Sequence, residues 1–169
     1  MCGTLESMKK TGIVFVAKYG VVVLGLVVFM YLASLNTFYD RLYVTIVIGG
    51  SVALSVTCAK ILKRLFKQPR PAVTTELFTP LDVYAFPSGH TSGVTALVLA
   101  LITFAVPFGL VASIIGLCVV VARVLARVHF TRDVVGGFVV ASLMTYYALP
   151  YLHLLTMVIV QYLKTSFPT

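Results

Sequence analysis

The chain has 169 residues, of which 60% are hydrophobic and 11% are charged, and its formal net charge is +8. Because a soluble globular domain has about 25% charged residues, this composition excludes an ordinary water-soluble protein. The mean hydropathy of +1.04 indicates a protein that lies in a membrane. No polar stretch approaches the roughly 50 residues of the smallest domains, so we expect residues 1–169 to form one membrane domain.

Five apolar segments follow one another along the chain, and a transmembrane helix needs about 20 mainly apolar residues. They are 11–34, 43–62, 90–106, 108–126 and 134–163. The first is too long for a signal peptide and has no cleavage site after it, which predicts a membrane anchor. The fifth contains Pro150, which leaves open one long kinked helix or a span followed by a separate half-span or surface helix. We therefore expect an all-α integral membrane bundle of five to six transmembrane helices.

Basic residues gather in two short windows near the ends of the second and fourth segments. They are Lys60, Lys63, Arg64, Lys67 and Arg70, and then Arg123, Arg127 and Arg132. The acidic residues near them are Glu76, Asp82 and Asp133. Since these cations outnumber the carboxylates, water or an external anion must neutralise the remainder.

The two windows are predicted to lie at one membrane face, because two spans separate them in an up-and-down bundle. Basic residues that merely mark cytoplasmic loops are the alternative. Two details favour a site instead. Lys63 and Arg70 are seven residues apart and would share one face of a helix. Arg123 continues an apolar run, and a charge at the centre of a span costs about 2.5–3.5 kcal/mol, so such residues usually face the bundle interior and mark function.

Residues 86–93 read FPSGHTSG at the start of the third segment. Pro87 fixes φ in the predicted turn, and Gly89 tolerates a positive φ or the close approach of another group. The hydroxyl of Ser88 and the backbone N–H groups at the start of the following helix are donors suited to an anion. His90 adds an imidazole to this turn.

His129 and Asp133 are four residues apart, so on a helical turn the carboxylate reaches the imidazole. Such a contact fixes the tautomer and leaves the second ring nitrogen to act as a base or nucleophile. Alone, the pair also fits an ordinary structural hydrogen bond. Together with the turn and with Lys63, Arg70 and Arg123, it supplies what phosphoryl transfer needs without a metal.

These residues resemble the three signature motifs of the type 2 phosphatidic acid phosphatase superfamily, which includes lipid phosphate phosphatases and soluble acid phosphatases. The motif residues here are Lys63 with Arg70 and Pro71, then 87–90 (PSGH), then Arg123 with His129 and Asp133. Their spacing and order agree with the family, and the resemblance covers about residues 60–150. One departure is Ala122, where the family often has Ser, so one phosphate or supporting contact could be missing.

The resemblance implies a role for each motif residue. His129 would attack phosphorus and form a phosphohistidine, with Asp133 orienting it and stabilising its charge. His90 would protonate the departing lipid alkoxide and then activate the hydrolytic water. The residues expected to bind phosphate are Lys63, Arg70, Ser88, Gly89 and Arg123. We expect no metal and no other cofactor, since the sequence has neither an acidic cluster for magnesium nor a Cys-x-x-Cys pair.

The resulting hypothesis is an integral membrane lipid phosphatase with its site at the membrane–water boundary. Its expected partners are a membrane lipid phosphate and the bilayer, with no nucleic acid. Phosphatidic acid, phosphatidylglycerophosphate, undecaprenyl pyrophosphate and lipid A 1-phosphate are candidate substrates within the family. Short loops favour a bacterial enzyme of the inner membrane. A phosphotransferase that uses the same phosphohistidine and a non-catalytic anion-binding protein are the alternatives.

The face that holds the site is left open by the sequence. Lys9 and Lys10 favour a cytoplasmic N-terminus, and two spans would return the motifs to that face. Undecaprenyl pyrophosphate or lipid A 1-phosphate would instead require the outer face and an inverted N-terminus.

Three local features carry further expectations. Arg123 and His129 are six residues apart, about 240° around an ideal helix, so we expect the fourth span to end near residues 127–128. The glycine pairs 49–50 and 136–137 are expected to permit close helix packing. The polar and aromatic segment 72–86 could cap the site or form a short surface helix.

Overall fold

The described part of the chain is a bundle of five helices. The computed structural model describes residues 2–70 and 84–166, with side chains from residue 11 onward. The helices are α1 Cys2–Ser34, α2 Phe38–Phe66, α3 Gly89–Phe104, α4 Val106–Leu125 and α5 Thr131–Ser166. Because these residues contain no strand, the predicted all-α bundle is confirmed.

Four of the helices are long and apolar enough to cross a membrane. They are α1 over Thr11–Ser34, α2, α4 and α5. The chain is therefore an integral membrane protein. The segment expected to span at 90–106 forms α3, a shorter apolar helix of 16 residues. At 1.5 Å per residue it is about 24 Å long, less than the roughly 30 Å of a hydrocarbon core.

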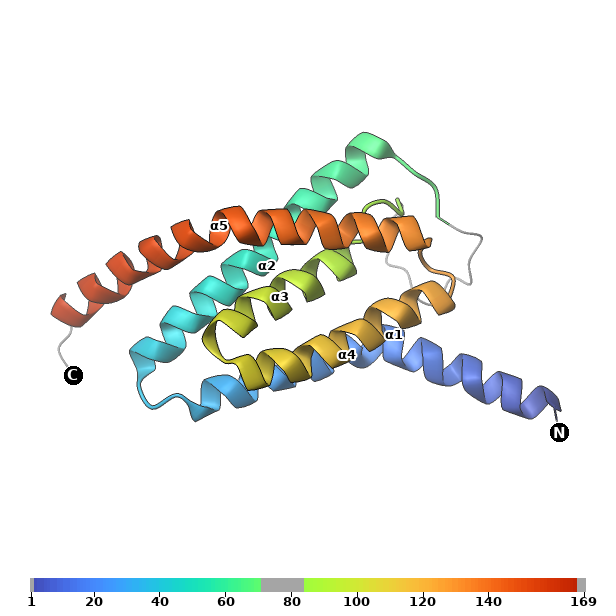
Figure 1. Cartoon of the computed structure of the whole chain (residues 1–169), viewed down its shortest axis with the longest axis horizontal. Helices are drawn as coiled ribbons and strands as arrows, with labels where there is room; N and C mark the ends of the chain where they lie inside the picture. Colours follow the sequence, from blue (N-terminus) through green and yellow to red (C-terminus); the bar gives the residue numbers. More distant parts are fainter. Residues whose placement is uncertain (1, 71–83, 167–169) are drawn as a thin grey trace.

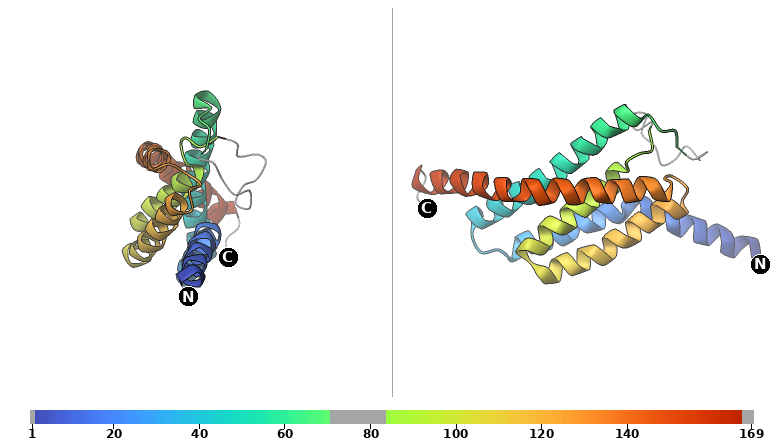
Figure 2. Two further views of the ribbon diagram at one scale, coloured as in Figure 1. Left: turned by 90° about the vertical axis from the view of Figure 1, so that its right-hand side faces the viewer. Right: turned by 45° about the horizontal axis from the view of Figure 1, so that its top comes forward.

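The last helix, α5, continues through Pro150 as one element of 36 residues. A separate helix after Pro150, which the sequence left open, is therefore not formed. The rise of 1.5 Å per residue makes α5 about 54 Å long, more than a bilayer core requires. Figures 1 and 2 show its C-terminal part extending past the turn between α3 and α4.

The bundle packs around α3. Helices α2 and α5 pack along α3 and along each other, and α4 packs along α3 from another side. Helix α1 packs along α4 and only slightly touches α2 (Figure 1). In contrast, α4 and α5 barely touch, although both contact α3.

The three predicted motifs lie at the same end of this bundle. The C-terminal ends of α2 and α4 and the N-terminal ends of α3 and α5 all lie at that end (Figures 1 and 2). The N-terminal part of α1 projects from that same end, while the C-terminus lies at the other. The chain start and the motifs therefore share one side of the bundle, as two intervening spans predict.

Candidate active site

The PSGH turn forms the N-terminal cap of α3. Ser88 is the N-cap residue, is fully buried, and accepts hydrogen bonds through Oγ from the backbone N–H of Thr91 at 3.4 Å and from its hydroxyl at 3.0 Å. Gly89 and His90 are the first residues of the helix, and His90 is exposed. Backbone N–H groups at such a helix start have no partner within the helix and are suited to bind an anion.

Gly89 is not required by the backbone of this turn. None of the described glycines has a positive φ, and a Cβ at Gly89 would meet no atom of the described residues within 4 Å. The positive φ that Gly89 could have supplied is therefore not used. The close approach of another group, such as a phosphate, stays a prediction.

The turn between α4 and α5 separates Arg123 from His129. Helix α4 ends at Leu125, about two residues before the expected position, and α5 begins at Thr131. The break is made by Arg127, which has φ 54°, in the left-handed region that usually favours glycine. Arg123 thus lies in the last turn of α4, whereas His129 lies in the connecting turn.

His129, in this connecting turn, faces Asp133, in the first turn of α5. His129 Nδ1 is 3.5 Å from Asp133 Oδ2, and both side chains are fully buried. The same carboxylate oxygen accepts a 2.9 Å hydrogen bond from the backbone N–H of Phe130, the residue before α5. A carboxylate at the third position of a helix that bonds back to the N-cap backbone is half of a capping box. The start of α5 therefore fixes the carboxylate that faces the imidazole.

The second and third motifs are joined directly through their backbones. Ser88 donates its N–H to the carbonyl oxygen of Asp133 at 2.8 Å. One turn further on, Ser92 Oγ lies 3.1 Å from the carbonyl oxygen of Gly137 and 3.0 Å from that of Ser88. Sequence analysis did not single out Ser92, although it follows Ser88 by one helical turn in FPSGHTSG.

The glycine pair 136–137 makes this junction possible. A Cβ at Gly137 would lie 2.6 Å from the carbonyl oxygen of Ser88, and one at Gly136 would lie 2.4 Å from the ring of Phe86. Gly137 also lies against Thr91 and Ser92 of α3, so it permits the close helix packing that was expected and, in addition, the close approach of the PSGH turn. In the other pair, Gly50 packs against Leu152 of α5, as expected, while Gly49 meets nothing within 4 Å.

Lys63 and Arg70 do not share a helix face, so that prediction is wrong. Helix α2 ends before Arg70, because Lys67 takes the left-handed C-cap conformation and donates its N–H to the carbonyl oxygen of Lys63 at 3.0 Å. The chain beyond the cap is bonded to the residues before Ser88, since Ala85 donates its N–H to the carbonyl oxygen of Gln68 at 2.9 Å. This bond fixes the start of the loop that carries Arg70 next to the residues that precede the PSGH turn.

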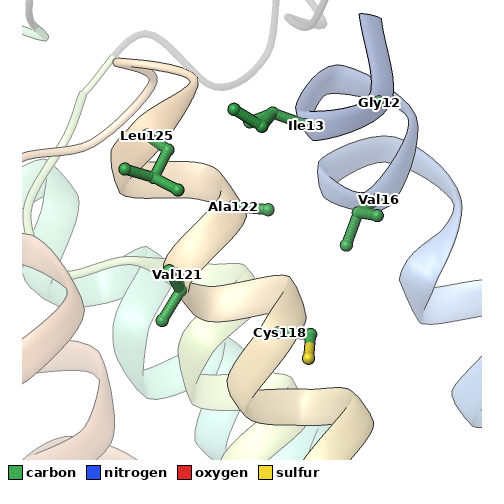
Figure 3. Close-up of a pocket in the computed structure, with 7 residues that line it drawn as sticks. All are labelled: Gly12, Ile13, Val16, Cys118, Val121, Ala122 and Leu125. Atoms are coloured by element: carbon green, nitrogen blue, oxygen red, sulfur yellow. The ribbon is translucent and has the colours of Figure 1, made fainter. Parts of the chain in front are cut away.

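Arg123 is held by the first helix. Its side chain is buried, and Nη1 donates a 3.2 Å hydrogen bond to the carbonyl oxygen of Ala17 in α1. The motifs do not predict this contact, because the resemblance does not reach α1. The neighbouring Ala122 faces α1 across an apolar groove (Figure 3).

Three cationic side chains are buried or half-buried at the site end of the bundle. Of the eight cations in the two windows, Lys63 and Arg123 are 6% and 3% exposed, and Arg70 is half-buried. The acidic side chains that the structure describes are Asp133, at this end, and Asp40, at the start of α2. Lysine and arginine side chains gathered in this way are suited to bind the oxygens of an anionic group such as phosphate.

Two expectations concern what could cover or occupy this site. Most of the segment 72–86, expected to cap it, lies outside the described residues. Within the described residues, no group of three or more His, Cys, Asp or Glu side chains could hold a metal ion. The side chains placed here are those of general acid–base, nucleophilic and anion-binding chemistry.

Comparison with known families agrees with the motifs. The family model described as PAP2 superfamily matches residues 44–157, about two thirds of the chain. The matched range contains all eight predicted site residues and excludes α1. No curated protein and no solved structure matches this chain.

Proposed function

Because this chain belongs to the PAP2 superfamily, we propose that it hydrolyses a phosphate ester or pyrophosphate of a membrane lipid through a phosphohistidine. The observation that carries this proposal is the buried contact of His129 with Asp133, joined to the PSGH turn by the bond from Ser88 to Asp133. Family membership supports a phosphatase and the apolar helices support a lipid substrate. The individual roles below are part of the proposal.

In the first step, His129 is the nucleophile. Asp133 faces Nδ1, so that Nδ1 carries the proton and Nε2 presents its lone pair to phosphorus. A bond forms between Nε2 and phosphorus as the bond from phosphorus to the lipid oxygen breaks. His90, at the exposed start of α3, gives its proton to that departing oxygen.

In the second step, water takes the place of the lipid. Neutral His90 accepts a proton from the water, whose oxygen then attacks phosphorus. The bond from phosphorus to Nε2 breaks, inorganic phosphate is released, and both histidines return to their starting protonation states. The carboxylate of Asp133 stabilises the positive charge that His129 carries in the phosphohistidine.

The remaining site residues bind the phosphoryl oxygens. Lys63, Arg70 and Arg123 supply positive charge. The PSGH turn supplies the hydroxyl of Ser88 and the backbone N–H groups of Gly89 and His90, since the N–H of Ser88 is already bonded to Asp133. Groups of this kind stabilise the charge on the equatorial oxygens in the transition state, and removing one such donor costs about 10²–10³ in kcat. No metal ion or other cofactor enters the proposed reaction.

The proposed substrate is a membrane lipid phosphate, because the described chain has little structure outside its apolar helices. We place the site at the membrane–water boundary of a bacterial inner membrane. Phosphatidic acid, phosphatidylglycerophosphate, undecaprenyl pyrophosphate and lipid A 1-phosphate remain the candidates. Residues 1–169 would act as one domain, with the reaction carried by the motif-bearing part at about 60–150.

The test is phosphate release by the purified protein in detergent with excess EDTA. These four lipids are offered to wild type and to the His129→Ala variant. We expect release by wild type alone, with a loss of at least ~10³-fold in the variant, because the nucleophile is gone. The preferred lipid then identifies the substrate class.

Two results would contradict the proposal. Transfer of phosphate to an added alcohol, without release, would identify a phosphotransferase. Tight lipid phosphate binding with neither release nor transfer by folded protein would identify an anion-binding protein.

A further inference from the structure

A groove opens between α4 and α5 on the surface of α3. It exists because α4 and α5 both pack on α3 but barely contact each other. The groove encloses about 400 Å³ and has no charged side chain in its lining. Because α4 and α5 are long and apolar enough to span a membrane, we expect this opening to face the hydrocarbon.

Each wall of the groove is a stripe of one helix. The lining positions are 91, 94, 95, 98 and 99 of α3 and 113, 116, 117 and 120 of α4. This spacing by three and four residues is that of a single helix face. On α5 the wall includes Val134 and Phe138. The exposed side chains that line the groove, such as those of Leu117 and Phe138, are apolar.

One end of the groove lies at the candidate active site. Thr91 lines the groove and donates its hydroxyl to Ser88 Oγ at 3.0 Å. Val134 lines it too and directly follows Asp133. From Thr91 the groove follows α3 to Leu99, eight residues or about 12 Å into the apolar part of the bundle.

We propose that this α3–α4–α5 groove binds a hydrocarbon chain of the lipid phosphate substrate. The inference rests on the proposed phosphatase function and adds the position of the chain and the direction of access. With the phosphate of the lipid at the PSGH turn, its hydrocarbon chain passes between α4 and α5 and remains among the bilayer lipids. The substrate therefore reaches the site sideways from the membrane rather than from the water.

A second groove on the other side of α4 serves as a control. It lies between α1 and α4, encloses about 470 Å³, and is lined by seven apolar or small residues that include Val121 and Ala122 (Figure 3). It has no lining residue from α3 or α5, the two helices whose starts are joined at the site. Val120 and Val121 are neighbours in the chain but line different grooves.

The first experiment compares Val120→Phe with Val121→Phe. Both add the same volume to α4, one residue apart, and neither residue belongs to the proposed catalytic machinery. We expect Val120→Phe to lower kcat/KM for long-chain phosphatidic acid at least about tenfold, which is within the range for a blocked apolar pocket. Turnover of dihexanoyl phosphatidic acid should stay within about twofold, and Val121→Phe should change neither.

Two kinetic outcomes would overturn the inference. One is an equal effect of Val120→Phe on both chain lengths. The other is a larger loss of long-chain turnover in Val121→Phe than in Val120→Phe.

Photolabelling tests the groove without measuring turnover and without a substitution that fills the groove. The probe is phosphatidic acid with a diazirine in the middle of its chain, added to His129→Ala protein in lipid nanodiscs. We expect label on peptides of α3, α4 and α5 that line the groove, removed by excess unlabelled phosphatidic acid. Label in the α1–α4 groove, or spread evenly over the lipid-facing helices, would overturn the inference.

The two proposals can fail separately. Phosphate release without groove labelling would refute the groove alone. Groove labelling in a protein that releases phosphate from no lipid would refute the phosphatase function and leave a lipid phosphate binding site.

Discussion

The backbone N–H of Ser88 donates a 2.8 Å hydrogen bond to the carbonyl oxygen of Asp133. Ser88 is the N-cap of α3, and Asp133 lies in the first turn of α5, so this bond joins the starts of two helices. The donors proposed to bind phosphate and the carboxylate proposed to orient His129 thus belong to one unit. Changes that separate these helix starts should lower activity without removing a catalytic side chain.

Gly137→Ala tests this junction. The new Cβ would lie 2.6 Å from the carbonyl oxygen of Ser88, so α5 must move away from the turn. We expect kcat to fall at least about tenfold, because small displacements of catalytic groups cost up to about 10²-fold. The thermal midpoint should fall as well.

Gly49→Ala is the matched control for that variant. Its Cβ would meet nothing within 4 Å, and alanine in a helix interior is about 0.5–1 kcal/mol more favourable than glycine. Activity should be unchanged and the thermal midpoint equal or higher. Full activity in Gly137→Ala would refute the importance of the junction.

Asp133→Asn should lower kcat by about 10²–10⁴ with a small change in KM, because an amide can favour the wrong tautomer of His129. Asp40→Asn is the control, since Asp40 is also the third residue of its helix, α2, and contacts its N-cap Thr37. Both changes alter a helix start, but Asp40 lies at the other end of the bundle. Steady-state kinetics should separate them, and equal losses would show that Asp133 acts only as a helix cap.

Gly89→Ala tests whether phosphate approaches the PSGH turn. The added methyl group would meet no protein atom within 4 Å, and no described glycine requires a positive φ. We therefore expect normal folding and an unchanged thermal midpoint. The KM for lipid phosphate and the inhibition constant for inorganic phosphate should each rise at least about tenfold, since a bound anion would meet the methyl group. Unchanged constants would place the phosphate elsewhere.

The position of the N-terminus should report the face that holds the site. The N-terminal part of α1 and the candidate site lie at the same end of the bundle, and the C-terminal end of α5 lies at the other end (Figure 1). Reporter fusions at the two termini should therefore appear on opposite sides of the membrane. A membrane-impermeant phosphate ester should be hydrolysed by sealed vesicles only when the N-terminal reporter is on the outside. Hydrolysis with that reporter inside would contradict this arrangement.

Much of the fold follows from apolar patterning. Residues 11–34 are expected as a span and lie within α1, which is long and apolar enough to cross a membrane, because an uninterrupted apolar run is stable in a bilayer as a helix. The break after Arg123 followed from geometry, since one straight helix cannot direct Arg123 and His129 the same way. The residue that makes this break could not be predicted, because Arg127 takes a left-handed conformation that the sequence around it does not indicate.

The errors concern contacts between distant segments and local helix ends. The heptad spacing of Lys63 and Arg70 suggested one helix face, but the left-handed cap at Lys67 ends the helix between them. The bond from Arg123 to Ala17 depends on how α1 packs against α4, and no motif encodes that packing. A local helix end decided the first, and tertiary packing decided the second.

The central claim is that His129 carries the phosphoryl group during turnover. The most direct measurement is to mix radiolabelled lipid phosphate with the enzyme, quench in alkali within milliseconds, and locate the labelled peptide by mass spectrometry. His90→Ala should accumulate more label than wild type when the leaving group is a good one, because water is no longer activated. The account predicts alkali-stable, acid-labile phosphate on His129 and none in His129→Ala. Phosphate on another residue, or continued release by His129→Ala at the wild-type rate, would contradict it.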